Sequence, residues 1–236
     1  MRTGETVASG AEALGLSLPD GACERFDRYR DLLEEKNRVM NLTAITEPDA
    51  IVTRHFADSA SFFAAVNPNQ SAKLIDVGSG AGFPGMVLKI LRPDMNITLL
   101  DATNKRITFL SAVAEDLGLT IEALHSRAED AAAKPQYRQQ YDFATARAVA
   151  ELRVLSEYCL GFVKVGGTFV AMKGQLSDEE LTSAANSIGV MGGKKEAVKT
   201  LTLADGSERC LLTVKKISQT PTKYPRCSAQ MSKKPL

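Results

Sequence analysis

Apolar residues recur along this chain at two different spacings, and the first spacing predicts helices. Up to residue 70 they return every three or four positions with charged residues between them, which is typical of amphipathic helices. We expect one helix over residues 20–40, capped by Asp20, and a second over about 47–66 that ends before Pro68. Because both helices precede the first strand-like run, residues 1–70 are predicted to form an N-terminal helical cap.

Beyond residue 70, short apolar runs alternate with longer amphipathic stretches, which indicates strands and helices in turn. Alternation of this length argues for a mostly parallel sheet with helices on both faces. The last two strand-like runs flank the turn Ala204-Asp205-Gly206 and predict an antiparallel hairpin. Residues 71–236 are therefore expected to form a doubly wound α/β domain, the architecture of the Rossmann-like methyltransferases. The predicted strands cover residues 73–77, 96–100, 121–124, 141–145, 168–172, 198–203 and 209–217, and the predicted helices cover about 84–92, 103–117, 150–163 and 177–188.

The run from Leu74 to Gly85 combines a hydrophobic strand ending in an acid, a glycine-rich turn and the start of a helix near Pro84. Glycines permit positive φ and let a ligand approach the backbone closely. The turn also presents backbone N–H groups at a helix N-terminus, which favours a polar or anionic ligand. This run therefore predicts a pocket for a nucleotide-type cofactor.

The spacing of the glycines separates three possible cofactors. A dinucleotide loop, G-x-G-x-x-G, needs glycine where Phe83 stands, and a phosphate-binding loop needs lysine where Met86 stands. The pattern that fits is acid-x-G-x-G-x-G, which resembles the S-adenosylmethionine (SAM) loop of Rossmann-like methyltransferases. The predicted cofactor-binding residues of the loop are Asp76, Gly78, Gly80, Gly82 and Phe83.

Two further positions lie at the sequence spacing expected for a cofactor site that includes this loop. Asp101 ends the second predicted strand about 20 residues after the glycines, where a carboxylate can accept both ribose hydroxyls. An acid there serves NAD and SAM equally, and it can also cap the helix that follows. After the third strand, Ala128 and Glu129 are expected beside the adenine ring.

Composition is ordinary for a globular protein, with 44% apolar and 24% charged residues in a chain of 236. No apolar run approaches the roughly 20 residues of a membrane span, and the first residues lack the apolar core of a secretory signal. We therefore expect a cytoplasmic protein without a membrane association. Only two histidines and four scattered cysteines occur, so no metal site or disulfide framework is expected.

Charge is distributed unevenly. Residues 191–236 carry ten Lys or Arg against three Asp or Glu, a net charge of +7, which leaves about −6 for the rest of the chain. This basic C-terminal segment is either a solvated tail or a surface that attracts a polyanion such as RNA. Charge alone does not separate the two interpretations.

Several short motifs along the chain occur together in a known family. They are Asn41 to Ile45, Arg54 to Ser59, Asp76 to Gly85, Leu99 to Asp101 with Lys105-Arg106, Arg127 to Glu129, Ala146 to Ala148, Lys173-Gly174, Tyr224 to Arg226 and Lys234 to Leu236. With these motifs the chain resembles the bacterial 16S ribosomal RNA guanine-N7 methyltransferases of the small-subunit methyltransferase G family. The sequence departs from that family at Lys36-Asn37, where Trp-Asn is usual, and over residues 227–230, where basic residues and glycine are favoured.

The resemblance implies methyl transfer from SAM to N7 of a guanine in the decoding-region loop of 16S rRNA. The candidate catalytic residues are Arg147, His55 and Lys173. Arg147 is expected to hold the methionine carboxylate of SAM or an RNA phosphate, or else to form a structural salt bridge. His55 is a candidate for substrate contact or for helix packing with Asp58, and Lys173 for phosphate contact or simple solvation.

Two other functions remain open on the residues. An NAD-dependent oxidoreductase would need glycine at Phe83. A non-catalytic RNA-binding protein on the same fold would be expected to have a degenerate glycine loop, and this loop is intact. The expected partner is 16S rRNA or the small ribosomal subunit, bound by a monomer.

Overall fold

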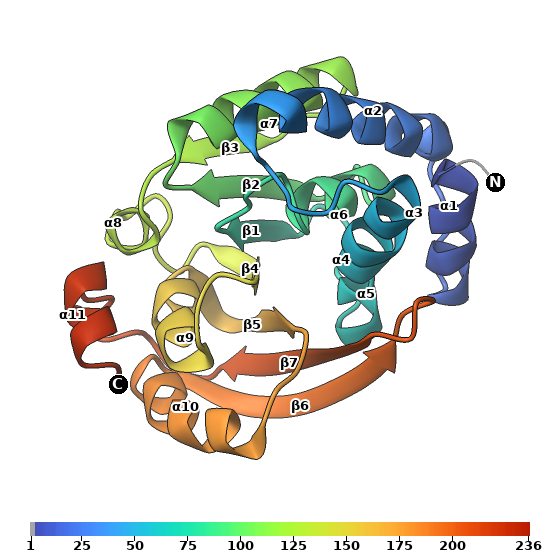
Figure 1. Cartoon of the computed structure of the whole chain (residues 1–236). Helices are drawn as coiled ribbons and strands as arrows, with labels where there is room; N and C mark the ends of the chain where they lie inside the picture. Colours follow the sequence, from blue (N-terminus) through green and yellow to red (C-terminus); the bar gives the residue numbers. More distant parts are fainter. Residues whose placement is uncertain (1–2) are drawn as a thin grey trace.

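A seven-stranded sheet occupies the centre of the computed structural model, which describes residues 3–236 (Figure 1). The strand order is β3-β2-β1-β4-β5-β7-β6. Neighbours from β3 to β5 run parallel, whereas β7 is antiparallel to both β5 and β6. The predicted parallel sheet with an antiparallel hairpin at its end is thus confirmed. The strands are β1 (Lys73–Val77), β2 (Asn96–Asp101), β3 (Glu122–His125), β4 (Tyr141–Arg147), β5 (Val163–Lys173), β6 (Gly193–Thr202) and β7 (Glu208–Lys216).

Helices precede and connect these strands. Helices α1, α8 and α11 were not predicted, and the predicted helix over about 150–163 ends at Leu160, so that β5 begins earlier than expected. The helices outside residues 47–66 are α1 (Thr3–Ala13), α2 (Ala22–Met40), α6 (Gly85–Leu91), α7 (Asn104–Asp116), α8 (Ala128–Ala132), α9 (Leu152–Leu160), α10 (Asp178–Val190) and α11 (Ser228–Lys233).

The prediction of a single helix over about 47–66 is wrong, because the segment is divided into several short helical elements. The segment forms α3 (Pro48–Ile51), the π-helix η1 (Val52–Ala57), α4 (Asp58–Ala60) and α5 (Phe62–Ala65). A π-helical turn is wider than an α-helical turn, and such turns occur frequently at functional sites. Arg54 and His55 both lie in this π-helical turn.

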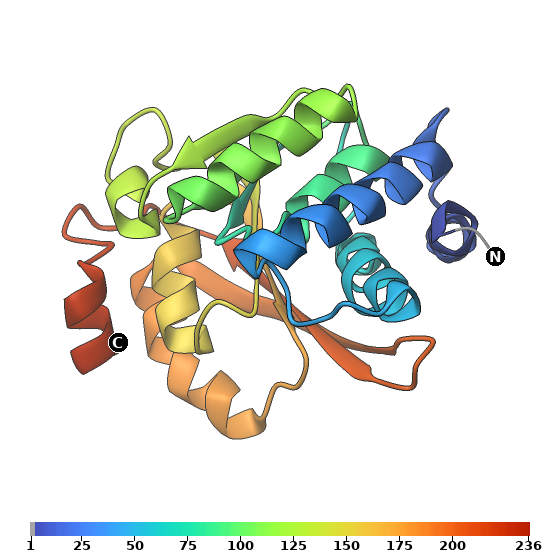
Figure 2. The ribbon, with the colours of Figure 1, turned by 45° about the horizontal axis from the view of Figure 1, so that its top comes forward.

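The sheet separates two hydrophobic cores because neighbouring residues of one strand face opposite sides. Leu74 packs with α2, α6 and α7, whereas Ile75 packs with α9 and α10. The same alternation divides Val170 from Ala171 on β5. Figure 2 shows α2, α6 and α7 gathered on one side and α9 and α10 on the other, as a doubly wound sheet requires.

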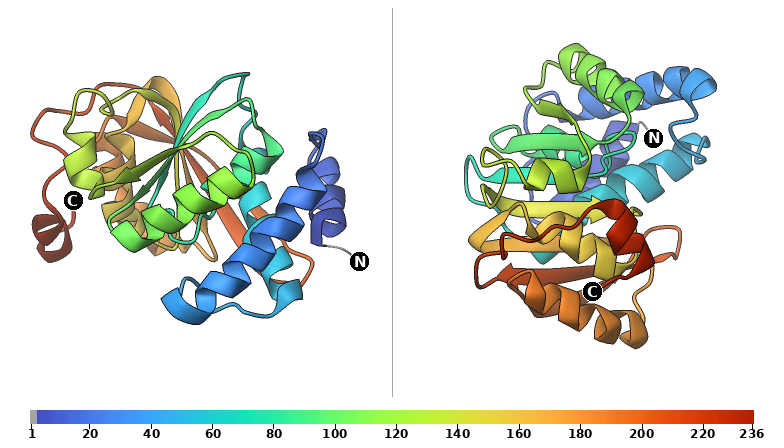
Figure 3. Two further views of the ribbon diagram at one scale, coloured as in Figure 1. Left: turned by 90° about the horizontal axis from the view of Figure 1, so that it is seen from above. Right: turned by 90° about the vertical axis from the view of Figure 1, so that its left-hand side faces the viewer.

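The N-terminal helices share the first of these cores. Phe26 and Leu33 of α2 are fully buried in the same cluster as Met86 of α6 and Leu110 of α7. The boundary at residue 70 stays a prediction, and packing across it is continuous. The N-terminal helix α1 and the C-terminal helix α11 lie at opposite ends of the molecule (Figure 3). In the part of the chain that the structure describes, no helix has the length and apolarity needed to cross a membrane.

Candidate active site

The side chain of Asp76, which is fully buried, supports the glycine loop. Its Oδ2 accepts a hydrogen bond of 2.9 Å from the backbone N–H of Gly85, at the start of α6. Burial raises the pKa of this carboxyl to about 7, and Oδ1 has no hydrogen-bond partner among the described residues. Asp76 therefore ties the two ends of the loop together, and its role toward the cofactor stays a prediction.

The three glycines of the predicted pattern all adopt positive φ, at 75° for Gly78, 58° for Gly80 and 107° for Gly82. These values fall in or near the left-handed region that favours glycine. The N–H of Gly78 donates to the carbonyl of Leu100 at 2.8 Å, which docks the loop on the end of β2. The loop geometry thus explains the glycine spacing in the sequence.

Tyr29 on α2 also holds this loop, and sequence reasoning missed its role. Its hydroxyl donates a 2.6 Å hydrogen bond to the carbonyl of Ala81. The ring of Phe83 lies 5.5 Å from that of Tyr29 and is stacked on His55 at 4.4 Å. The only sequence signal at Tyr29 is its place on the apolar face of a helix, which does not distinguish a hydroxyl that binds a loop.

Asp101 connects the loop to the next turn of the chain. Its Oδ2 accepts from the N–H of Gly80 at 3.0 Å, and its Oδ1 accepts from the N–H of Thr103 at 2.8 Å. The Nη1 of Arg106 lies 3.4 Å from the same Oδ2. The carboxylate is 4% exposed, so it borders the cavity beside the loop while it stabilises the turn into α7.

A cavity at the carboxyl ends of β1, β2 and β3 brings together four of the nine predicted cofactor residues, namely Gly78, Asp101, Ala128 and Glu129. Glu129 is buried on this cavity wall, and its Oε1 accepts from the N–H of Ser228 at 3.2 Å. A Cβ added to Gly78 would lie 2.8 Å from Val149, so only glycine leaves this wall open. Two carboxylates and a bare glycine backbone fit the ribose, the adenine edge and the methionine end of SAM. The lining residues are Val77, Gly78, Leu100, Asp101, Ala102, Ser126, Arg127, Ala128, Glu129, Val149 and Tyr158.

A second cavity of about 500 Å³ adjoins the first across residues 148–150. Val149 faces the first cavity, while Ala148 and Ala150 line the second. The second cavity collects all three predicted catalytic residues. Its lining residues are Arg54, His55, Asp58, Arg147, Ala148, Ala150, Met172, Lys173, Gly174 and Arg209.

An ion cluster forms the wall of this second cavity. The Oδ2 of Asp58 accepts from the Nη1 of Arg147 at 2.8 Å, and its Oδ1 lies 3.1 Å from the Nε of Arg209. The same Nη1 of Arg147 donates to the carbonyl of Arg54 at 3.1 Å. The structure therefore gives Arg147 the salt bridge that was one of its expected roles. Sequence reasoning missed Arg209, whose only signal was its place in the basic C-terminal segment.

His55 is held as a neutral ring within this cluster. Its Nδ1 faces the Nη2 of Arg147 at 3.1 Å and so accepts, while its Nε2 is 2.8 Å from the hydroxyl of Thr43 and donates. Burial and the positive charge of Arg147 lower the pKa of His55 to about 3. His55 is consequently uncharged near neutral pH, with its one ring proton engaged at Nε2, and serves as packing and hydrogen-bonding support.

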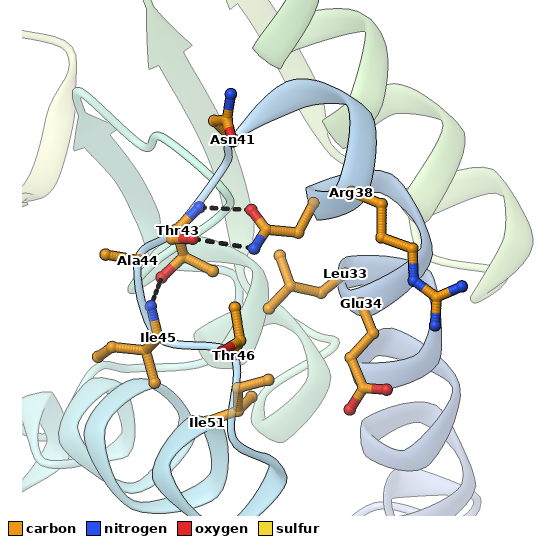
Figure 4. Close-up of a pocket in the computed structure, with 10 residues that line it drawn as sticks. Leu33, Glu34, Arg38, Asn41, Thr43, Ala44, Ile45, Thr46 and Ile51 are labelled. Carbon is orange, nitrogen blue, oxygen red and sulfur yellow. Dashed lines mark hydrogen bonds between the residues drawn. The ribbon is translucent and has the colours of Figure 1, made fainter.

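Thr43 is itself fixed by Asn37 on α2. The N–H of Thr43 donates to the Oδ1 of Asn37 at 2.8 Å, and the Nδ2 of Asn37 donates back to the Thr43 carbonyl at 2.9 Å. The hydroxyl of Thr43 also accepts from the N–H of Ile45 at 3.0 Å (Figure 4). Asn37 is kept beside the unusual Lys36, so the departure from the family pattern leaves this support intact. The segment of residues 41–46 and α2 enclose a separate cavity. Its lining residues are Leu33, Glu34, Asn37, Arg38, Asn41, Thr43 to Thr46 and Ile51.

Lys173 lies at the end of β5 on the opposite wall of the second cavity. Its ammonium group donates to the Oε1 of Glu180 at 2.6 Å, and the same oxygen accepts from the N–H of Leu152 at 2.9 Å. The side chain is 18% exposed. Phosphate contact by Lys173 would therefore compete with Glu180 and stays a prediction. Within the described residues no group of three metal-ligating side chains is present.

Comparisons with known proteins agree with this arrangement. The family described as rRNA small subunit methyltransferase G matches residues 22–210. The chain is 45% identical over 232 residues to ribosomal RNA small subunit methyltransferase G of Alkaliphilus metalliredigens, covering 98% of this chain and 97% of the relative. It is 46% identical to the protein of the same name from Acetivibrio thermocellus, covering 98% of this chain and 95% of the relative.

Solved structures show the same fold at low identity. The YcgJ protein of Bacillus subtilis aligns with a TM-score of 0.55 at 11% identity, over 70% of this chain and 100% of that one. A 16S rRNA (adenine(1408)-N(1))-methyltransferase variant from Catenulisporales acidiphilia, solved with SAM, aligns with a TM-score of 0.55 at 15% identity, over 70% of this chain and 90% of that one.

Proposed function

Because the chain belongs to the rRNA small subunit methyltransferase G family, whose members are SAM-dependent enzymes, we propose that it methylates N7 of a guanine in the decoding-region loop of 16S rRNA. The observation that carries the proposal is the position of the second cavity. It adjoins the cofactor cavity across residues 148–150, and its lining contains four basic side chains and one carboxylate, Asp58. Two of the four, Lys173 and Arg54, pair with carboxylates outside the lining, Glu180 and Asp205. A site of this kind suits an RNA base whose backbone is anionic.

The chemistry requires no general base. Guanine N7 has an in-plane lone pair and no proton, so it bonds to the methyl carbon while the bond to sulfur breaks and leaves its electrons on sulfur. SAM, when bound, supplies the activated methyl group as a sulfonium. Catalysis then depends chiefly on how the base is placed in line with that group. The neutral His55, with both ring nitrogens engaged, agrees with such a mechanism.

We propose that Arg147 positions the acceptor guanine by forming part of the cavity wall. Both of its Nη atoms are engaged by the protein, and its guanidinium lies over the ring of Phe83, with Cζ 5.2 Å from the centroid. A bidentate grip on the methionine carboxylate would require those bonds to break. Arg147 is therefore assigned to the wall that separates the glycine loop from the acceptor, and Lys173 to a phosphate contact that exchanges with Glu180.

Residues of the N-terminal helices and of the basic C-terminal segment line the cavity at which RNA is expected to bind. Arg54 reaches the acceptor cavity from η1, and Arg209 reaches it from the basic C-terminal segment. Lys199 of β6 is exposed and lies in register with Leu211 and Met172, near this end of the sheet, whereas the exposed Lys194 and Lys195 lie toward its opposite end. We accordingly assign 16S rRNA or the small ribosomal subunit as the partner, met in the cytoplasm by a monomer. The intact glycine loop favours this enzyme over a non-catalytic RNA-binding protein. Membership of a methyltransferase family argues against an NAD-dependent oxidoreductase.

Nucleoside mass spectrometry of 16S rRNA tests the proposal. Purified protein and SAM are incubated with 16S rRNA and with small subunits from a strain that lacks this gene, and the modified nucleotide is mapped. We expect 7-methylguanosine at one position in the decoding-region loop, formed only when both protein and SAM are present. Methylation of another base, or of an exocyclic amine, would refute the assignment.

A further inference from the structure

Resting on the proposed function, we propose that the cavity between α2 and the segment of residues 41–46 binds a second guanine of the substrate RNA, close to the one that is methylated. The volume of this cavity is about 440 Å³, within the range of roughly 300–1,000 Å³ that is typical of small-ligand pockets. It shares no lining residue with the cofactor cavity or the acceptor cavity, so the mechanism described above leaves it without a role.

A carboxylate oxygen without a hydrogen-bond partner belongs to the lining of this cavity. Glu34 of α2 supplies it: its Oε1 is buried and accepts no hydrogen bond from the part of the chain that the structure describes. The Nε of Arg30 lies 3.8 Å from this oxygen, beyond hydrogen-bond distance, and donates to Asp31 instead. The Glu34 side chain as a whole is 35% exposed, so a ligand can reach it. Because a buried acceptor left unpaired is costly, a ligand that brings an N–H group to Glu34 would be bound favourably.

Arg38 stands one turn further along α2 and lines the same cavity (Figure 4). It is exposed and makes no hydrogen bond or ion pair with any residue that the structure describes. The walls also include Leu33 and Ile51, which are buried and form an apolar surface. The cavity thus combines apolar walls with one unpaired acceptor and one cation. A nucleotide carries the three complementary groups, which are a flat ring, N–H donors on the edge of that ring and an anionic phosphate.

The location favours a nucleotide of the substrate RNA. Thr43 forms part of the cavity wall, and its hydroxyl is 2.8 Å from the Nε2 of His55, which lines the acceptor cavity. One hydrogen bond therefore links the walls of the two cavities. A single strand that places its target guanine in the acceptor cavity can reach the other cavity with a nearby nucleotide. Proteins recognise unpaired RNA bases in this manner, by hydrogen bonds to their Watson–Crick edges.

The carboxylate of Glu34 selects guanine among the four bases. Only guanine presents an imino and an amino N–H side by side on its Watson–Crick edge, and these two donors match the two oxygens of one carboxylate. Adenine and cytosine offer an amino group alone, and uracil offers an imino group alone. Glu34 is thus assigned to the base and Arg38 to a phosphate of the same strand. Because this cavity is separate from the one that receives the target, both residues act on the affinity for RNA and leave methyl transfer itself unchanged.

The test is a double-variant cycle between protein and substrate RNA. Each guanine of the decoding-region loop other than the target is replaced in turn by inosine, which lacks the amino group. For the wild type, one replacement should raise the KM for RNA by about 10- to 150-fold, the range for one hydrogen bond to a charged group, with kcat unchanged. The same replacement should have no effect on Glu34→Ala, whose KM is already raised. Comparing the two proteins cancels any effect of inosine on the folding of the RNA.

The phosphate contact and a matched control are measured in the same assay. Arg38→Gln should weaken the binding of all these RNAs alike and reduce the slope of log K against log salt concentration by about 1. Glu35→Gln is the control, because Glu35 is a carboxylate of the same helix that pairs with Lys36 at 2.8 Å and does not line the cavity. Its KM and its response to inosine should equal those of the wild type.

Equal effects of every inosine on the wild type and on Glu34→Ala would overturn the proposal. So would a loss of affinity of Glu34→Ala for free guanosine monophosphate with unchanged kinetics on RNA, which would make the cavity a site for a free nucleotide. SAM affinity and thermal unfolding show whether Glu34→Ala is folded. If it is not, Glu34→Gln keeps the shape of the side chain with a single acceptor oxygen and should lessen the inosine effect. If the wild type methylates a different atom, it is the proposed function that fails, and mapping of the product reveals that separately.

Discussion

The hydroxyl of Tyr29 donates a 2.6 Å hydrogen bond to the carbonyl of Ala81, so a helix that precedes the sheet holds the middle of the glycine loop. Both partners are buried. The bond is therefore shielded from water, and a carbonyl left without its donor there is costly. The N-terminal helices thus contribute directly to the geometry of the cofactor cavity.

Replacing Tyr29 by Phe should weaken both folding and cofactor binding. Leaving the Ala81 carbonyl unsatisfied is expected to cost about 1–3 kcal/mol of unfolding free energy. SAM affinity, measured by calorimetry, should fall because the loop loses its support. Tyr137→Phe removes a surface hydroxyl that donates to Glu122 and is the matched control. Equal SAM affinities for the two variants would show that Tyr29 does not support the loop.

Gly82→Ala should abolish most SAM binding. Gly82 has a φ of 107°, where alanine is strained by about 1–3 kcal/mol, and its new Cβ would overlap the hydroxyl of Tyr29. Gly189→Ala in α10 is the control, since no heavy atom lies within 4 Å of the added Cβ. That control should gain about 0.4–1 kcal/mol of unfolding free energy and bind SAM normally. Normal binding by Gly82→Ala would contradict the loop geometry described above.

Asp76 should give the protein a pH-dependent stability that Asp76→Asn lacks. Its pKa is about 7 in the folded chain, above the ordinary value of 3.8, because burial disfavours the charged form. The folded state therefore binds the extra proton, and this contribution to stability is complete below about pH 4 and is lost as pH rises through 7. Urea unfolding of both proteins between pH 4 and 8 checks the prediction. The difference between them should change by at most about 1.4 kcal/mol per pH unit, and a constant difference would exclude the raised pKa.

Arg226→Ala should destabilise the fold strongly. The backbone N–H, the Nε and the Nη2 of Arg226 all reach the carboxylate of Glu157, at 2.8, 2.9 and 2.7 Å, and that side chain is 1% exposed. Removing the arginine leaves a buried charge, which costs about 3–5 kcal/mol. The double variant Glu157→Gln/Arg226→Met removes both charges and should recover most of the loss in urea unfolding. If the double variant is no more stable than Arg226→Ala, the ion pair is not the reason for the loss.

The same contact limits what the basic C-terminal segment can do. Arg226 is committed to Glu157, and Lys216 is buried with its ammonium group bonded to the carbonyls of Leu160 and Met191. A count of charges along the sequence treats these side chains like the exposed lysines of β6. Only the folded structure distinguishes the cations that face solvent from those that hold the chain together.

Sequence patterns predicted the features that depend on local order. The alternation of strands and helices, the turn at residues 204–206 and the glycine spacing each follow from short stretches of chain. The π-helix η1 does not follow from a short stretch of chain, because its residues contact side chains that are remote in the sequence. His55 stacks on Phe83, and Asp58 pairs with Arg147 and Arg209, residues that are remote in the sequence.

For the same reason, candidate residues were found more readily than their roles. Arg147 and His55 were each identified as candidate catalytic residues, His55 with Asp58 as its expected packing partner, and the structure brings Arg147 to 3.1 Å from His55. Arg209 and Tyr29 were missed because each acts through a contact with a distant segment. A side chain whose partner is remote in sequence has no local pattern by which to recognise it.

Strand β7 has a consequence for the order in which the two cavities can be completed. Every residue that lines the cofactor cavity precedes residue 159, whereas the acceptor cavity needs Arg209, which inserts between β5 and β6 only after the last hairpin has formed. A nascent or truncated chain ending near residue 190 would contain the whole lining of the cofactor cavity and lack Arg209 from the wall of the second cavity. The topology thereby makes the proposed RNA-binding wall the last part of the site to be completed during synthesis.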